Sequence, residues 1–167
     1  MEKERQLILT AVDVERKLER MAREILENNY SNDKVFLIGL KERGAKVGQK
    51  IFEILKGISS KEFVLAELEK EGSDKAIEFE ERFGDELRGS SVILIDDVLN
   101  SGKTLISKVC FLLRFEPSQL STLVLVDRKH RKFPVRADVV GLTLSTTLKE
   151  HISVIEDENG GFLVFLD

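Results

Sequence analysis

The apolar positions in the first third of the chain change from helical to strand spacing. Between Asp13 and Asn28 they recur every three or four residues, which is typical of one helical face, and Asp13 is placed to cap that helix. The run VFLIGL at 35–40 shows no polar alternation, so it predicts a strand covered on both faces of a sheet. Helical spacing returns from Ala45 to Lys56 and predicts a second helix.

The same two patterns alternate through the rest of the chain. Further strands are predicted at 63–68, 92–95, 123–126 and 139–140. A helix is expected from Lys103 to Phe115, before Pro117. The chain ends in a predicted hairpin, with strands at 152–155 and 162–166 around a turn at 157–161. This order favours an α/β fold over 1–167: one domain with a mostly parallel sheet flanked by helices, and a C-terminal β-hairpin.

One segment departs from this alternation because it is strongly acidic. Residues 61–88 contain ten acidic and five basic side chains, a balance of -5 against -4 for the whole chain. We therefore expect a variable acidic loop at about 67–88 that is mobile and solvated.

Charge and cysteine content narrow the functional classes. The 167 residues include 26 Lys and Arg against 30 Asp and Glu, which excludes a generally basic surface for nucleic acid. The one cysteine, Cys110, excludes an internal disulfide and a cysteine-based zinc cluster, and its apolar neighbours predict a core position. No apolar run approaches the roughly 18 residues that span a bilayer, and the start MEKERQL lacks a signal-peptide core, so we expect a cytoplasmic protein without membrane contact.

The most informative stretch joins the strand at 92–95 to the helix that follows it. Asp96 and Asp97 come directly after the strand, and residues 100–104 lead into the helix. A loop that enters a helix presents free backbone N–H groups and the positive end of the helix dipole to an anion. Two carboxylates beside such a loop suit the hydroxyl groups of a sugar. This order predicts a site for a ribose 5-phosphate.

Two other interpretations of this stretch are weaker. Ser101-Gly102-Lys103-Thr104 imitates the end of a nucleotide P-loop, but that motif needs a glycine at position 97, where this chain has Asp. An acidic strand end followed by an ordinary polar turn explains an isolated DDxxxSG. It does not explain why a buried strand, paired acids and an apolar helix coincide.

The string VILIDDVLNSGKTL at 92–105 resembles the phosphoribosyl pyrophosphate (PRPP) motif of type I phosphoribosyltransferases. The later segment LVLVDRKHRKFPVRADVVG at 123–141 is similar to one branch, the pyrimidine operon attenuation proteins that are also uracil phosphoribosyltransferases. The order of elements matches that branch over nearly the whole chain except about 67–88.

The resemblance implies a role for each part of the site. Asp96 and Asp97 would hold the ribose hydroxyls, with Arg43 as a third catalytic residue, and Val139 and Val140 would lie beside the base. The other PRPP-binding residues implied are Leu40, Lys41, Gly44, Val98, Asn100, Ser101, Gly102, Lys103 and Thr104. Members often have a non-proline cis peptide in the loop at 40–44. The resemblance also implies a homodimer or higher homo-oligomer, and Mg²⁺ that arrives on PRPP rather than in a protein cage.

The chain also departs from that family. Its segment after the third strand lacks the arginine-containing motif of the loop that closes over PRPP. Glu19, Arg23 and Leu142 replace residues of the RNA-facing surface. A basic cluster remains as the candidate RNA site, made by Arg128, Lys129, His130, Arg131, Lys132 and Arg136.

Three functions stay open on the sequence. The first is transfer of the phosphoribosyl group of PRPP to a pyrimidine base, with uracil favoured. The second is an RNA-binding regulator of pyrimidine genes that senses PRPP or a nucleotide. The third is a nucleotide-binding homologue with weak catalysis.

Overall fold

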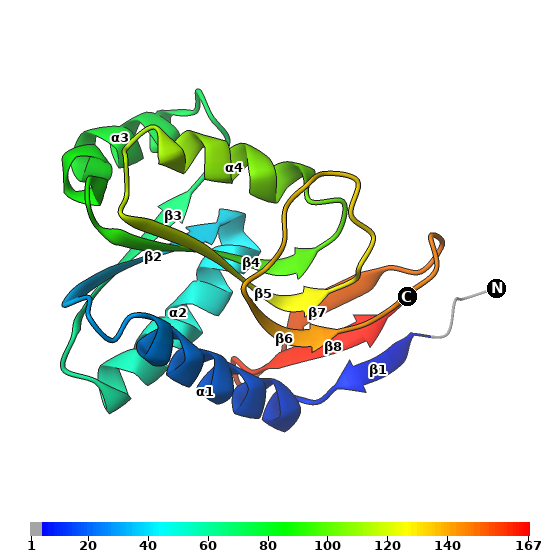
Figure 1. Ribbon diagram of the computed structural model, residues 1–167. Helices are drawn as coiled ribbons and strands as arrows, with labels where there is room; N and C mark the ends of the chain where they lie inside the picture. The colour runs from blue at the N-terminus through cyan, green and yellow to red at the C-terminus, as the bar shows by residue number, and fades with distance from the viewer. Residues whose placement is uncertain (1–4) are drawn as a thin grey trace.

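The computed structural model describes residues 5–167 (Figure 1). Its centre is a five-stranded parallel sheet in the order β3-β2-β4-β5-β6. The strands are β2 (Lys34–Leu40), β3 (Glu62–Leu68), β4 (Ser91–Leu99), β5 (Gln119–Asp127) and β6 (Val139–Thr143). The predicted α/β class and the mostly parallel sheet are confirmed.

Two helices cover each face of this sheet (Figure 1). They are α1 (Ala11–Asn28) and α2 (Lys41–Ile58) on one face, and α3 (Asp74–Leu87) and α4 (Lys103–Leu113) on the other. Successive β2 side chains enter opposite cores: Val35 and Leu37 pack with α1 and α2, whereas Phe36 and Ile38 pack with α3 and α4. This double burial explains why the strand has no polar alternation.

A separate antiparallel sheet is built from both ends of the chain. Its strand order is β1 (Gln6–Leu9), β8 (Phe162–Leu166) and β7 (Ile152–Glu156). The predicted C-terminal hairpin is confirmed as β7 and β8. The short strand β1 was not predicted, and it adds to this hairpin by pairing Leu7 with Phe165.

Several element boundaries differ from those expected. Helix α1 is capped by Thr10, and Asp13 is its third residue, whose carboxylate accepts from the Thr10 backbone N–H at 3.0 Å. Helix α2 begins at Lys41 instead of Ala45. Strand β4 continues through the acidic pair to Leu99, and α4 ends at Leu113 rather than Phe115.

The predicted mobile acidic loop is wrong for most of its length. Residues 74–87 form α3, capped by the Ser73 side chain. Its buried face consists of Ala76, Phe79, Phe83 and Leu87. The acidic residues occupy the other face. The segment is therefore an ordinary amphipathic helix, which its acidic composition alone did not indicate. Only 69–73 connects it to β3.

The packing of α4 differs from the prediction at Cys110. Cys110 is exposed rather than buried, and Leu113 is 53% exposed. Phe111 is buried in their place, against Phe79 with the ring centroids 6.4 Å apart. Among the described helices, none is long and apolar enough to cross a membrane.

Candidate active site

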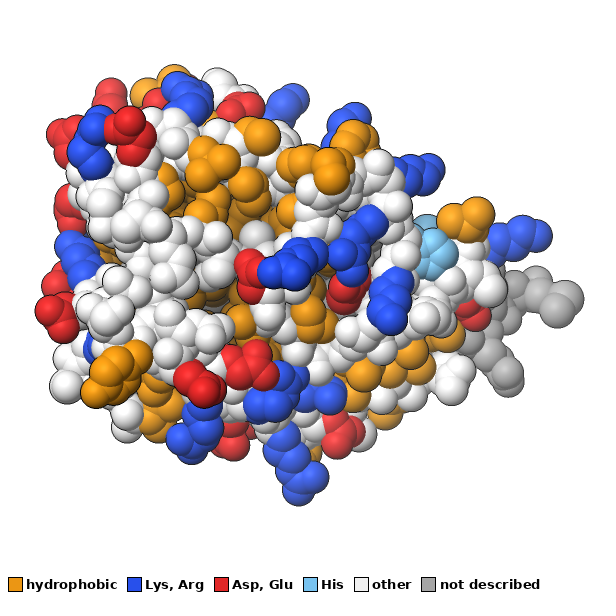
Figure 2. All heavy atoms as spheres, viewed as in Figure 1, with side chains coloured by type: hydrophobic (Ala, Val, Ile, Leu, Met, Phe, Trp, Pro, Cys, Tyr) orange, Lys and Arg blue, Asp and Glu red, His pale blue; other side chains and the backbone are white. Residues whose placement is uncertain are grey.

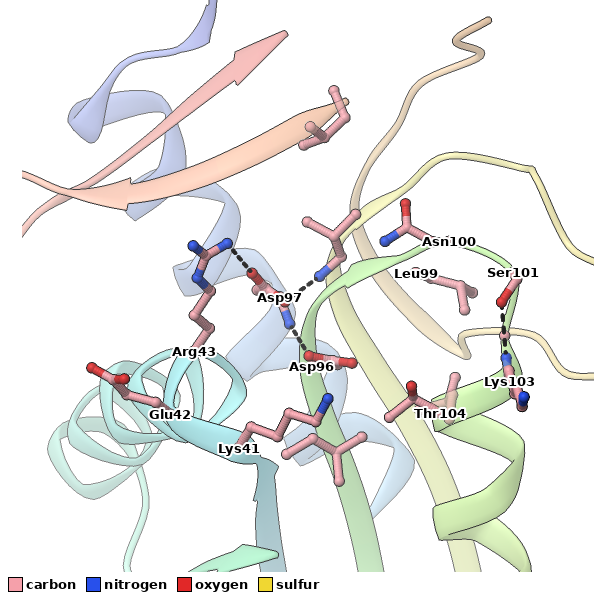
Figure 3. A pocket seen from close by; sticks show the side chains of 15 residues that line it. Lys41, Glu42, Arg43, Asp96, Asp97, Leu99, Asn100, Ser101, Lys103 and Thr104 are labelled. Carbon is pink, nitrogen blue, oxygen red and sulfur yellow. Dashed lines mark hydrogen bonds and ion pairs between the residues drawn. The ribbon is translucent and has the colours of Figure 1, made fainter. Parts of the chain in front are cut away.

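A cavity of about 430 Å³ opens where β2 and β4 end and α2 and α4 begin. Figure 3 shows Lys41 and Arg43 on one side of the acidic pair and Asn100, Ser101 and Thr104 on the other. The structure thus brings together two segments far apart in sequence. The lining residues are Leu40, Lys41, Glu42, Arg43, Asp96, Asp97, Val98, Leu99, Asn100, Ser101, Gly102, Lys103, Thr104, Leu105 and Ile152.

The two carboxylates lie inside β4 and have different surroundings. The Asp97 backbone N–H donates to Asp96 Oδ1 at 2.9 Å, and the Val98 N–H donates to Asp97 Oδ1 at 2.9 Å. Burial, with a further contribution from the charge of Asp97, raises the pKa of Asp96 to about 8. Asp97 faces Arg43, with 3.9 Å between Oδ2 and the guanidinium. The pair therefore contains one carboxyl that favours its neutral form and one that faces a cation.

The first turn of α2 supplies the basic side of the cavity. Lys41 has a φ of 53°, and the Arg43 side chain is 66% exposed. All peptide bonds between described residues are trans, so the cis peptide that the family resemblance suggested is not found. Gly44, predicted to touch PRPP, lies outside the lining. It lets α2 pack on β4, since a Cβ there would come within 2.6 Å of the Ile95 carbonyl oxygen.

The loop at 100–104, which we call the phosphate loop, has the geometry expected for an anion site. Gly102 has a φ of 84° and precedes the first residue of α4. A Cβ on Gly102 would lie 2.6 Å from the Val135 side chain, so the position requires glycine on both grounds. The Ser101 carbonyl accepts from the backbone N–H of Lys132 at 2.9 Å and of Phe133 at 3.2 Å. The segment after β5 thus supports this loop from behind.

The basic cluster is divided rather than gathered on one surface. Arg128 is only 7% exposed, which departs from the surface position an RNA contact requires. Arg131 pairs with Asp127 at 2.9 Å, and the His130 ring contacts the Thr146 carbonyl. Arg136 is exposed and lies 3.5 Å from Asp138. On the face drawn in Figure 2, basic and acidic side chains are interspersed without a continuous basic surface.

The residues predicted to flank the base lie outside the cavity lining. Val139 is buried, and Arg20 donates to the carbonyls of Val140 at 2.7 Å and Gly141 at 3.1 Å. Both valines stand at the start of β6, whereas the cavity lies at the carboxyl ends of the strands. The Val140 carbonyl is therefore already engaged by α1.

Four lining residues were missed by the sequence reasoning: Glu42, Leu99, Leu105 and Ile152. The first three are direct neighbours in sequence of predicted site residues. Extending each predicted segment by one residue would therefore have included them. Ile152 comes from the antiparallel sheet, and no local pattern marks it as part of a site.

The groups that line the cavity suit a ligand with both hydroxyl and anionic groups. Across residues 5–167, no group of three or more His, Cys, Asp or Glu side chains is arranged to hold a metal ion. The cavity instead offers two carboxyls for hydroxyl groups, a helix N-terminus for a phosphate, and Lys41 and Arg43 for further anionic oxygens. This combination suits a phosphorylated sugar with a second anionic group.

Comparisons with known proteins agree with this chemistry. The model of the phosphoribosyl transferase domain matches residues 7–158. The chain is 35% identical over 158 residues to the "Bifunctional protein PyrR" of Streptococcus thermophilus strain LMD-9, covering 92% of this chain and 91% of the relative. It is 37% identical to the protein of that name from Oceanobacillus iheyensis, with 88% of each covered.

Solved structures show the same fold at low sequence identity. The hypoxanthine-guanine phosphoribosyltransferase of Leishmania tarentolae, in complex with GMP, is 15% identical with a TM-score of 0.80, covering 100% of this chain and 99% of that one. The hypoxanthine phosphoribosyltransferase of Trypanosoma cruzi is also 15% identical, with a TM-score of 0.76 and coverage of 96% and 95%.

Proposed function

The chain belongs to the phosphoribosyltransferase family, and from that membership we propose that it transfers the 5-phosphoribosyl group of PRPP to a pyrimidine base, releasing pyrophosphate. One observation carries the proposal: Asp96 and Asp97 share one cavity with the phosphate loop and with the first turn of α2. Relatives that cover most of the chain are named "Bifunctional protein PyrR" or "Pyrimidine operon regulatory protein", which favours a pyrimidine base, and the sequence resemblance favours uracil.

In this proposal the acidic pair and the phosphate loop hold the sugar at its two ends. The carboxyl oxygens of Asp96 and Asp97 accept from the ribose hydroxyls. The N–H groups at 101–104 and the Thr104 hydroxyl donate to the 5-phosphate. With both ends fixed, the anomeric carbon is oriented for attack by a base nitrogen.

The reaction breaks the bond between ribose C1 and pyrophosphate, and positive charge develops on the sugar. Asp97 stabilises that charge, while Lys41 and Arg43 stabilise the departing pyrophosphate. Mg²⁺ enters on PRPP and shields the charge of its pyrophosphate when bound. The segment that follows β3 is short, at 69–73, and none of its residues lines the cavity. The cations that face the leaving group therefore come from the first turn of α2.

A product assay tests the proposal. The protein is incubated with PRPP, Mg²⁺ and one of uracil, cytosine, hypoxanthine or guanine, and nucleotides are separated by chromatography. We expect UMP from uracil and little product from the purines. Arg88→Lys, remote from the cavity and with its side chain 70% exposed, is the control and should match the native protein. Nucleotide from the purines alone, or from no base, would reject the proposed reaction.

The proposal also covers regulation, assembly and location. The sequence resemblance implies RNA binding, for which the exposed members of the basic cluster are Lys129, Arg131, Lys132 and Arg136. We also propose a homo-oligomer and a cytoplasmic location, both by analogy with the family.

A further inference from the structure

A buried arginine directly after β5 contacts both the phosphate loop and the segment that leads to Ile152. Arg128 is 7% exposed, and its backbone N–H donates to the carbonyl of Leu99, the last residue of β4, at 3.1 Å. A buried cation is costly unless its donors are satisfied. The acceptors that satisfy this guanidinium therefore indicate what it does.

These acceptors come from two separate segments. One guanidinium nitrogen donates to Asn100 Oδ1, at 2.8 Å, in the phosphate loop. The Nε–H donates to Thr146 Oγ1 at 3.0 Å, and the remaining nitrogen donates to the carbonyls of Thr147, at 3.3 Å, and Glu150. The planar guanidinium fixes the directions of all these bonds at once.

The second of these segments has little regular structure of its own. Residues 144–151 join β6 to β7 and lead directly into Ile152, which lines the cavity. Further support comes from the His130 ring, which contacts the Thr146 carbonyl, and from the Leu144 N–H, which donates to the Asp127 carbonyl at 2.9 Å. The guanidinium is thus the group that joins this segment to the phosphate loop.

We infer that Arg128 is a positioning residue for the proposed transfer: it holds Asn100 in the phosphate loop and the segment at 146–150 in one geometry. The inference rests on the proposed function. A lysine keeps the charge but not the fork of donors, so it cannot reach Asn100 and the Thr146 side simultaneously. The arginine therefore serves the site from within, instead of facing RNA.

Calorimetric titration with ribose 5-phosphate tests this without requiring turnover. We expect Arg128→Lys to bind ribose 5-phosphate about tenfold more weakly, the loss typical of a removed hydrogen bond to a charged group. Asn100→Ala should lose a similar factor, and the double variant little more, because both changes break one link. The matched control, Arg88→Lys, should stay within about twofold of the native protein.

The unfolding midpoint of each variant, measured alongside, separates positioning from a merely structural role. A folded Arg128→Lys protein with native affinity for ribose 5-phosphate would overturn the inference, as would fully additive losses in the double variant. If Arg128→Lys does not fold, Thr146→Val replaces it, because this change removes one acceptor of the guanidinium. It is then combined with Asn100→Ala in the same double-mutant comparison, and the same outcomes overturn the inference. Absence of nucleotide product from the native protein would reject the proposed reaction, while the titration still decides the role of Arg128.

Discussion

Asp96 stands inside a strand, among residues that are buried on both faces of the sheet. Its carboxyl accepts from the next backbone N–H and lies beside a second carboxylate, while Lys41 is the nearby cation that lowers its pKa. Burial dominates, and its pKa is about 8. At neutral pH this carboxyl therefore retains its proton, at the position where we propose that the ribose hydroxyls bind.

Because the folded chain retains this proton, the free energy of unfolding depends on pH. In the unfolded chain the carboxyl has its ordinary pKa of 3.8 and releases the proton there, whereas the folded chain retains the proton up to about pH 8. Between these values the folded state binds more protons, so rising pH favours unfolding. We expect Asp96→Asn to flatten this decline, improving stability at pH 8 relative to pH 5 by more than about 1.4 kcal/mol, the equivalent of one pKa unit. Urea unfolding at both pH values measures it.

The exposed Asp85→Asn serves as the control for that experiment, since it changes one carboxylate on the outer face of α3. Its pH dependence should match that of the native protein. An equal slope for Asp96→Asn and the native protein would contradict the assignment of a raised pKa.

Replacement of both acids tests the sugar contact at the same scale. We expect Asp96→Asn with Asp97→Asn to abolish PRPP binding by calorimetry and leave the circular dichroism spectrum unchanged. The amides keep the shape of the side chains, but Asp97→Asn removes the negative charge that strengthens bonds from the hydroxyls, and Asp96→Asn removes the carboxyl beside it. Unchanged affinity in the folded double variant would remove the ribose contact from the proposal.

At the scale of elements, α3 shows how charge can conceal a packed helix. Phe79 and Phe83 pack with their ring centroids 5.3 Å apart, and Phe83 meets Phe36 of the sheet at 6.2 Å. The helix thus completes the core on its side of the sheet. The acidic side chains keep its outer face in water.

We expect Phe79→Ala to destabilise the protein by about 3–5 kcal/mol, the usual loss for a buried aromatic side chain. Ile77→Ala is the control: Ile77 lies on the same helix but is 48% exposed, and its loss should be clearly smaller. Chemical denaturation compares the free energies of unfolding of the two variants, provided that both have the same dependence on denaturant concentration. Similarly small losses of stability in both variants would contradict a packed helix and favour a solvated loop.

Elements with a local sequence pattern could be predicted, whereas those that depend on distant partners could not. Five apolar runs located the strands of the parallel sheet, and the string at 92–105 located most of the cavity. Strand β1 is too short to show a period, and it exists because β8 pairs with it. Arg128 looked like part of a charged surface because the acceptors of its side chain are backbone and side-chain oxygens 18 or more positions away.

At the scale of the whole molecule, the distribution of charge bears on RNA binding. The net charge is -4, and Arg128, Arg131 and Arg136 all have partners within the protein. The cluster at 128–136 therefore offers fewer free cations than its composition suggests. Among the members of the cluster, Lys129 and Lys132 are exposed and remain the candidates for phosphate contact.

We expect weak RNA binding without sequence preference. About three phosphate contacts on single-stranded RNA would give a log–log salt slope of roughly -2. Fluorescence anisotropy across a salt series, with a pyrimidine-leader hairpin and a scrambled control, measures both properties. Nanomolar binding that prefers the hairpin by about a hundredfold would make regulation the primary function.

The antiparallel sheet has a consequence for the order in which the molecule assembles. Arg5 donates to Asp167 at 2.7 Å across 162 positions of sequence, and β1 pairs only with β8. Contacts this distant in sequence close slowly, because chain entropy is lost before they are gained. During synthesis the parallel sheet and the acidic pair can form first, while β1 waits for almost the entire chain. The wall that contains Ile152 therefore forms late, and until then the cavity that we propose for a sugar phosphate is open on one side.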